Sequence, residues 1–174
     1  DRAAGRALRV AVCAAPPAGS THDGVAAAIQ AAADAFSDAG AQVTDAVPPS
    51  FQRAVELWGL ILNEELRVQK PLLDIVMGEG GKKFLSFADA VYPPIDTGAL
   101  MMAFAERNVV DREWHTFLTE YDVLLMPTWA QPPFELGADI VSVEAAQSVL
   151  EQLRPVLPAN LLGLPSAIVP VGMA

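Results

Sequence analysis

The sequence is poor in the residues that several protein classes require. It has one cysteine, Cys13, so it cannot form an internal disulfide and is typical of a reducing compartment. Apolar neighbours predict that Cys13 is a buried strand thiol. The two histidines, His22 and His115, are far apart and lack the spacing of metal ligands. We therefore expect neither a metal nor a cofactor, and we predict a cytoplasmic location.

Positive charge and long hydrophobic runs are also scarce. The chain has 11 Lys and Arg against 21 Asp and Glu, a net charge of −10, and its basic residues are scattered. A nucleic-acid partner needs a concentrated basic face, so this class is excluded. No apolar run approaches the roughly 18 residues of a membrane span. Neither a nucleic acid nor a membrane is expected as a partner.

Hydrophobic residues are abundant in total, at 52% of 174 residues. This length suits one domain or a large part of one. An apolar excess without a membrane span predicts surface that more protein covers. Neither end reads as a natural terminus, and we expect residues 1–174 to be a single segment of a longer domain.

The hydrophobic pattern predicts an α/β fold with a sheet covered by helices on both faces. Strand 8–14, helix 23–39 and strand 41–47 form a βαβ unit with parallel strands. Thr21 or Asp23 can cap this helix, and Gly40 suits its end. The remaining expected helices are 51–70, which Pro71 ends, 71–77, 82–91, 97–121 and 143–153. The remaining expected strands are 122–127 and 166–171.

Few stretches have the pattern of a functional site. "MGEGGKK" resembles a phosphate loop but follows no strand, so we interpret it as a helix–helix connection. Lys82 and Ser86 have the spacing of a Ser–Lys pair, but nothing indicates that the lysine is buried. "APPAGSTHDG" leads from a strand into a helix N-terminus, where an anion can bind.

The loop 128–139 is the best candidate for a ligand contact. It follows strand 122–127, and loops at the carboxyl ends of strands line the sites of open α/β sheets. An exposed Trp129 beside Gln131 would form a wall for a substrate. The alternative is that Trp129 packs beneath its own proline-rich loop.

The C-terminal third resembles the amidase signature family. The residues that carry the resemblance are "YDVLLMPTWAQPPF" and "LRPVLPANLLGLPSAIVPVG", with Pro127-Thr128, Asn160, Gly163, Pro165, Pro170 and Gly172 at the motif positions. We expect Asn160 and Gly163 to lie in a turn, where Gly163 permits a conformation that a side chain would forbid and Asn160 hydrogen-bonds neighbouring backbone. The order of the preceding elements matches the C-terminal half of such an amidase domain, so the resemblance covers nearly the whole chain. It implies a mixed sheet and a hydrolase that cleaves a small carboxamide to a carboxylate and ammonia or an amine.

In that family, a Ser–cis-Ser–Lys triad and a Gly/Ser-rich oxyanion site perform the chemistry. No such stretch is in this sequence, so the resemblance implies no catalytic residue here. The chain would supply scaffold and pocket wall, with Trp129 and Gln131 as the substrate-binding candidates. The expected partners are the small amide substrate, the remainder of the amidase chain and, as a further option, a second copy in a homodimer.

Three alternatives to a general amidase remain at this point. One is the A subunit of a glutamine-dependent tRNA amidotransferase. Members of that group tend to have an acidic residue about seven positions before the Asn, where this chain has Leu153-Arg154. That departure favours a general amidase. The other two are a non-catalytic α/β module that binds a ligand and an interaction domain that docks a partner through its apolar surface.

Overall fold

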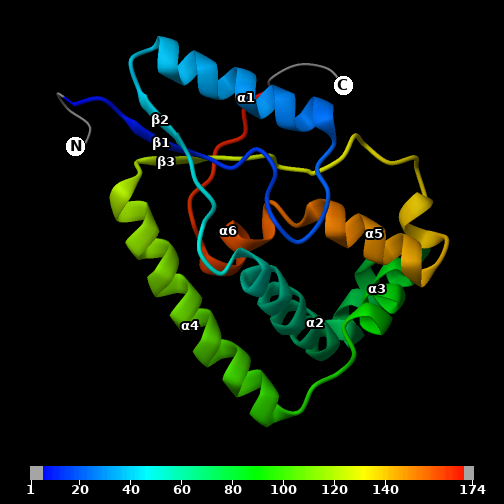
Figure 1. Ribbon diagram of the computed structural model, residues 1–174. Coiled ribbons are helices and arrows are strands. Elements are labelled where there is room, and N and C mark those ends of the chain that lie inside the picture. Colours follow the sequence, from blue (N-terminus) through cyan, green and yellow to red (C-terminus); the bar gives the residue numbers. More distant parts are fainter. Residues whose placement is uncertain (1–5, 171–174) are drawn as a thin grey trace.

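A computed structural model describes residues 6–170 of the chain. The elements in chain order are β1 (Arg9–Val12), α1 (Asp23–Asp38), β2 (Gln42–Asp45), α2 (Phe51–Val76), α3 (Glu79–Val91), α4 (Thr97–Glu120), β3 (Val123–Leu125), the 3₁₀ turn η1 (Ala138–Ile140), α5 (Val143–Leu153) and α6 (Leu157–Leu162). Figure 1 shows α1 on one side of the sheet and α2, α4 and α6 on the other. The predicted α/β class is confirmed.

The sheet has the order β2-β1-β3. Strand β1 pairs in parallel with both neighbours, so that Val10 lies opposite Val43 on one side and Val123 on the other. The predicted βαβ unit is therefore present. Both described strand pairs are parallel, where a mixed sheet was expected.

Each face of the sheet has its own hydrophobic cluster, because successive strand side chains point to opposite faces. Val10, Val12, Val123 and Leu125 belong to a cluster with Ile29 and Ala33 of α1. Leu124 and Met126 pack against the second cluster, whose buried members are Phe51, Ala54, Leu57, Ile61, Ala103, Val110, Trp114, Leu161 and Leu162. Helices therefore cover both faces, as the sequence predicts.

Several predicted boundaries are wrong. Helix α2 does not end at Pro71 but continues to Val76. Pro71 is exposed, so solvent can satisfy the carbonyl that loses its helical N–H partner. Helix α3 begins at Glu79, although residues 78–81 were expected to lie between helices. Only Gly78 precedes the helix, as its N-cap. The N-cap of α1 is His22, whose Nδ1 accepts from the Gly24 N–H at 3.1 Å, in place of Thr21 or Asp23.

The C-terminal segment differs most from expectation. The turn expected near Asn160 includes a short helix, α6, which ends at Gly163 with φ 68°. That angle is in the left-handed region, as the turn role of Gly163 requires. Residues 166–170 form no strand, and each of them is exposed. A strand needs a hydrogen-bonding neighbour, which the described residues do not provide; residue 171 lies outside them.

A buried arginine, Arg154, joins α5 to the loop between β1 and α1. It is 2% exposed. Its guanidinium donates hydrogen bonds of 2.8–3.1 Å to five oxygens: the carbonyls of Pro16, Pro17, Ser20 and Glu151 and the hydroxyl of Thr21. Burial lowers the pKa of Arg154 from its ordinary value. Because the loop carbonyls accept their hydrogen bonds from Arg154, the path of the loop between β1 and α1 depends on this side chain.

Replacing Arg154 with methionine removes those five hydrogen bonds but keeps an unbranched apolar stem. Buried carbonyls would be left without a partner, and we expect a loss of about 2–4 kcal/mol in the free energy of unfolding, measured with urea. The control is Arg53→Met, because Arg53 forms ion pairs with Glu56 and Glu106 while 40% exposed. That variant should lose less than about 1 kcal/mol. Equal losses in the two variants would contradict the role of Arg154.

Gly59 lies where α2 passes the ring of Tyr92. A Cβ atom at this position would overlap with the Tyr92 ring. Gly59→Ala should therefore destabilise the fold by about 1–3 kcal/mol, although alanine favours a helix. In the Tyr92→Ala background the same change should be neutral or stabilising, and thermal unfolding of the four proteins measures this coupling. A higher melting temperature for Gly59→Ala alone would show that helix propensity outweighs the overlap.

Candidate functional site

The loops that follow β1 and β3 meet at one edge of the sheet, because the carboxyl ends of parallel strands lie together. Ala130 is fully buried and is the backbone link between them. Its carbonyl accepts from the His22 N–H at 2.9 Å, and its N–H donates to the Gln152 carbonyl of α5 at 2.9 Å. The predicted site loop is thus fixed to both α1 and α5.

Trp129 is half-buried in this loop. Its Nε1–H donates to Oε1 of Gln152 at 3.2 Å. Its ring centre lies 6.0 Å from that of Phe134, farther along the same loop. The indole therefore packs partly within its own loop, as the alternative interpretation describes, while part of its surface stays accessible.

Gln131 contacts a different element from Trp129. Its Nε2 lies 3.3 Å from Oγ and 3.4 Å from the carbonyl of Ser20, in the loop before α1. These hydrogen bonds are long and exposed, so the amide can exchange them for a ligand at little cost. The two candidates lie on one loop, on either side of Ala130, but the structure brings one to α5 and the other to the loop after β1.

The other motifs form no catalytic arrangement in residues 6–170. Ser86 Oγ donates to the Lys83 carbonyl at 2.7 Å, and Lys82 Nζ contacts Oε1 of Glu79 at 3.0 Å, so these two side chains form no Ser–Lys pair. Cys13 is buried, and burial raises the pKa of its thiol. The described residues contain no group of three potential metal ligands and no helix long and apolar enough to cross a membrane.

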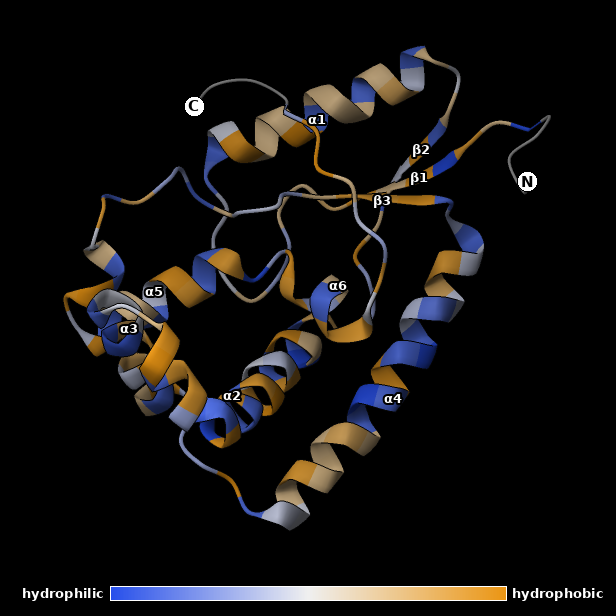
Figure 2. Cartoon of the chain, turned by 180° about the vertical axis from the view of Figure 1, so that it is seen from behind, coloured by the Kyte–Doolittle hydropathy of each residue, from blue (hydrophilic) through white to orange (hydrophobic). Residues whose placement is uncertain are grey.

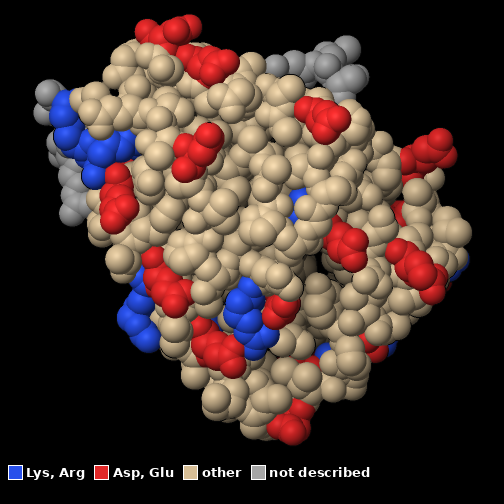
Figure 3. All heavy atoms as spheres, in the orientation of Figure 1, with Lys and Arg blue, Asp and Glu red and all other residues tan. Residues whose placement is uncertain are grey.

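Acidic and basic side chains are dispersed over the face in Figure 3, with broad uncharged areas between them. One ion-paired group lies at the start of β3, where Asp122 accepts from Arg6 Nη1 at 2.6 Å and from the Arg9 N–H at 2.9 Å. Hydrogen bonds from Arg6 and Arg9 hold the pKa of Asp122 well below its usual range. This carboxylate joins the starts of β1 and β3 and has no part in the candidate site.

A cleft of about 480 Å³ runs beside β3. Its walls come from the end of α4, from β3, from α6 and from residues 164–168. β3 is one of the two edge strands of the described sheet, and it is hydrophobic along its length (Figure 2). Trp114 lines the cleft and is fully buried, and its Nε1–H has no hydrogen-bond partner within residues 6–170. A buried donor without an acceptor is unfavourable by about 1–3 kcal/mol.

Sequence reasoning missed several of these features. Asn160 is a motif residue that we expected to bond to nearby backbone, but its Oδ1 accepts from Trp58 Nε1 at 2.7 Å. Arg154 was noted only as a departure from an acidic pattern. The cleft beside β3 depends on the folding of four segments, and no local pattern predicts it.

Comparison with known proteins identifies the family. The Amidase family model matches residues 2–174. Indoleacetamide hydrolase of Bradyrhizobium diazoefficiens is 31% identical over 168 residues, which cover 95% of this chain and 32% of that protein. Acylamidase of Rhodococcus erythropolis is 31% identical over 146 residues, which cover 79% of this chain and 30% of that protein. The chain thus spans about a third of the length of these relatives.

The fold agrees with these matches. The A subunit of glutamyl-tRNA(Gln) amidotransferase from Thermotoga maritima superposes with a TM-score of 0.64 at 20% identity, covering 90% of this chain and 33% of that structure. The family match over residues 2–174 shows that the chain belongs to the amidase family.

Proposed function

We propose that the protein containing this chain hydrolyses a small carboxamide to a carboxylate and ammonia or an amine. The observation that carries the proposal is the amidase family match, which extends over residues 2–174. The relative named indoleacetamide hydrolase favours an amide with an aromatic acyl group, and the relative named acylamidase supports the reaction class. The catalytic groups would lie in the part of the protein outside this chain, and residues 1–174 would be the C-terminal part of the amidase domain.

The role of this segment is to support the site and form part of its wall. The open side of β3 and the cleft beside it are the proposed seat for the remainder of the amidase domain. This assignment is supported by the exposed side chains of Ile168 and Val169. A single buried cysteine, Cys13, supports a cytoplasmic location.

A tRNA-amidotransferase function is the second candidate, and the position of Leu153 argues against it. Leu153 ends α5 and lies seven residues before Asn160. It is half-buried and cannot ion-pair with the amino group of glutamine. A leucine favours an uncharged acyl group in this region. The proposed substrate is therefore an amide without an α-amino group.

The reaction is tested by measuring ammonia released from indole-3-acetamide and phenylacetamide. We expect the full-length protein to turn over these amides and the 174-residue chain to be inactive, because groups for nucleophilic and oxyanion chemistry typically contribute about 10²-fold or more each. Ser37→Ala, on the exposed end of α1, is the activity control. The proposal is overturned if the 174-residue chain hydrolyses these amides by itself and replacing one of its own serines or lysines abolishes that activity. An inactive full-length protein would overturn it as well.

Trp129→Ala tests the proposed pocket wall in the full-length protein. We expect KM for the aromatic amides to rise about tenfold, with a small change in melting temperature, because part of the indole is accessible. Phe134→Ala removes the ring that packs on Trp129 and is the matched control. If both variants lower the melting temperature equally and leave KM unchanged, Trp129 has a packing role alone.

A further inference from the structure

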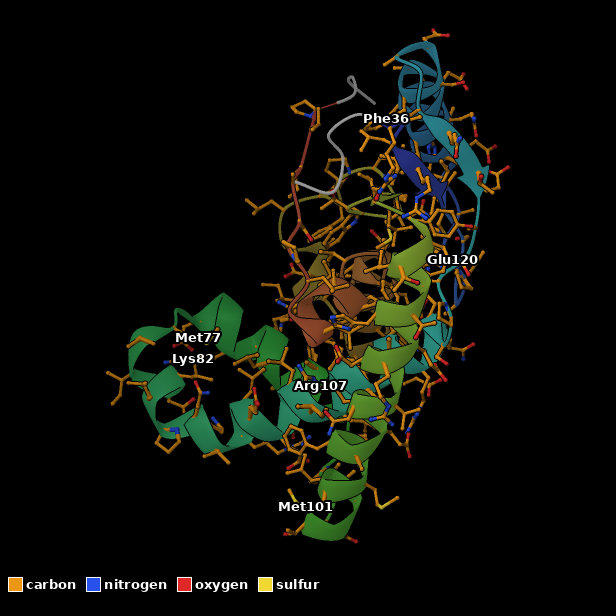
Figure 4. The ribbon with its side chains drawn as sticks, turned by 90° about the vertical axis from the view of Figure 1, so that its left-hand side faces the viewer. Phe36, Met77, Lys82, Met101, Arg107 and Glu120 are labelled. Carbon is orange, nitrogen blue, oxygen red and sulfur yellow. The ribbon has the colours of Figure 1, made fainter. Side chains whose placement is uncertain are left out.

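The C-terminal half of α2 and helix α3 form a hairpin that stands out from the body of the molecule. Figure 4 shows it at Met77 and Lys82, to one side of α4. It borders an open cavity of about 400 Å³, lined by side chains between positions 63 and 77 of α2, by side chains between positions 82 and 89 of α3, and by Pro94. This volume is within the range of small-molecule sites.

The lining gives the cavity a preference for an uncharged, largely apolar molecule. Its apolar surface comes from Leu66, Leu73, Met77, Leu85 and Pro94. The charged side chains of the lining are already in ion pairs: Arg67 with Asp89 at 2.6 Å, Lys70 with Asp74 at 2.7 Å, and Lys82 with Glu79 outside the lining at 3.0 Å. A ligand with its own charge would compete with one of these pairs, whereas a neutral ligand would not.

One polar group of the lining has unused capacity. Asn63 is only 6% exposed, and its Nδ2 donates to the Gly59 carbonyl at 2.8 Å. Its Oδ1 accepts no hydrogen bond from the described part of the chain, although amide oxygens have two lone pairs. This oxygen borders the cavity and is available to accept a hydrogen bond from a molecule bound there.

We propose that this cavity binds a small neutral molecule with an apolar body and an N–H group that donates to Asn63 Oδ1. Primary carboxamides have this chemistry. The apolar lining surrounds the body of the molecule, and Asn63 fixes the orientation of its N–H group. Binding requires no hydrolysis, so this inference can be tested separately from the reaction proposed above.

Hydrolysis-resistant probes separate hydrogen bonding from shape. Phenylmethanesulfonamide is neutral, aromatic and an N–H donor, whereas benzyl methyl sulfone has a similar shape without an N–H. Isothermal titration of the full-length protein should give a Kd on the order of a millimolar or below for the sulfonamide. The sulfone should bind about tenfold more weakly, as should the charged probes benzylamine and phenylacetate. Equal affinities for sulfonamide and sulfone, tighter binding of a charged probe, or no binding would overturn the proposal.

Variants assign the binding to this cavity. Asn63→Leu should weaken sulfonamide binding about tenfold and remove its preference over the sulfone. Leu85→Trp fills the cavity from a half-buried position and should abolish binding of both probes. Gln52→Leu, at the exposed start of α2, is the matched control and should bind as the unaltered protein does. A preference that survives Asn63→Leu overturns the role of Asn63. If Asn63→Leu does not fold, unchanged binding to Leu85→Trp overturns the site.

Discussion

The parallel pairing of β1 on both of its edges is the constraint on which the other parts of this structure depend. Val10 and Ala11 are fully buried, because strands cover both edges of β1 and hydrophobic clusters cover both faces. Two parallel neighbours require that α1 and then α2–α4 cross between the strands. The same pairing brings the loops after β1 and β3 to one edge, where Ala130 links them and Arg154 joins the loop after β1 to α5. The candidate site is a consequence of this strand geometry.

The described sheet has an edge strand on either side of β1, and the edge at β3 borders a cleft. Beside this cleft lies an extended segment with exposed Ile168 and Val169. In an amidase family chain that spans about a third of its relatives' length, we interpret these features as a surface that the remainder of the domain covers. The high apolar content of the sequence has the same interpretation.

The sequence predicted the parts of the fold that depend on local patterns. The βαβ unit, the left-handed glycines 40 and 163 and helix α5 follow from hydrophobic period and turn chemistry. The predicted end of helix α2 at Pro71 was wrong, because an exposed helix position tolerates the hydrogen bond that proline removes. Residues 166–170 have a strand-like sequence, but they lack a strand neighbour among the described residues, and β-structure depends on pairing more than on propensity.

The site could be predicted only in part. The position of Trp129 and Gln131 after a strand indicated the correct loop, and their use by a substrate stays a prediction. The role of Arg154 could not be predicted, because three of its five acceptors are backbone carbonyls more than 130 residues away in the sequence. The unused oxygen of Asn63 likewise becomes visible only when α2 and α3 are folded together.

Hydrogen exchange at the Leu124 amide tests directly whether the remainder of the amidase domain covers the open edge of β3. The Leu125 carbonyl accepts from the Cys13 N–H, so the backbone of Leu125 faces β1 and that of Leu124 faces the open side. In NMR measurements on the 174-residue chain and on the full-length protein, we expect slow amide exchange at Val10–Val12 in both. The Leu124 amide should be protected only in the full-length protein. Equal protection of Leu124 in the two proteins would contradict the claim that the remainder of the amidase domain covers this edge.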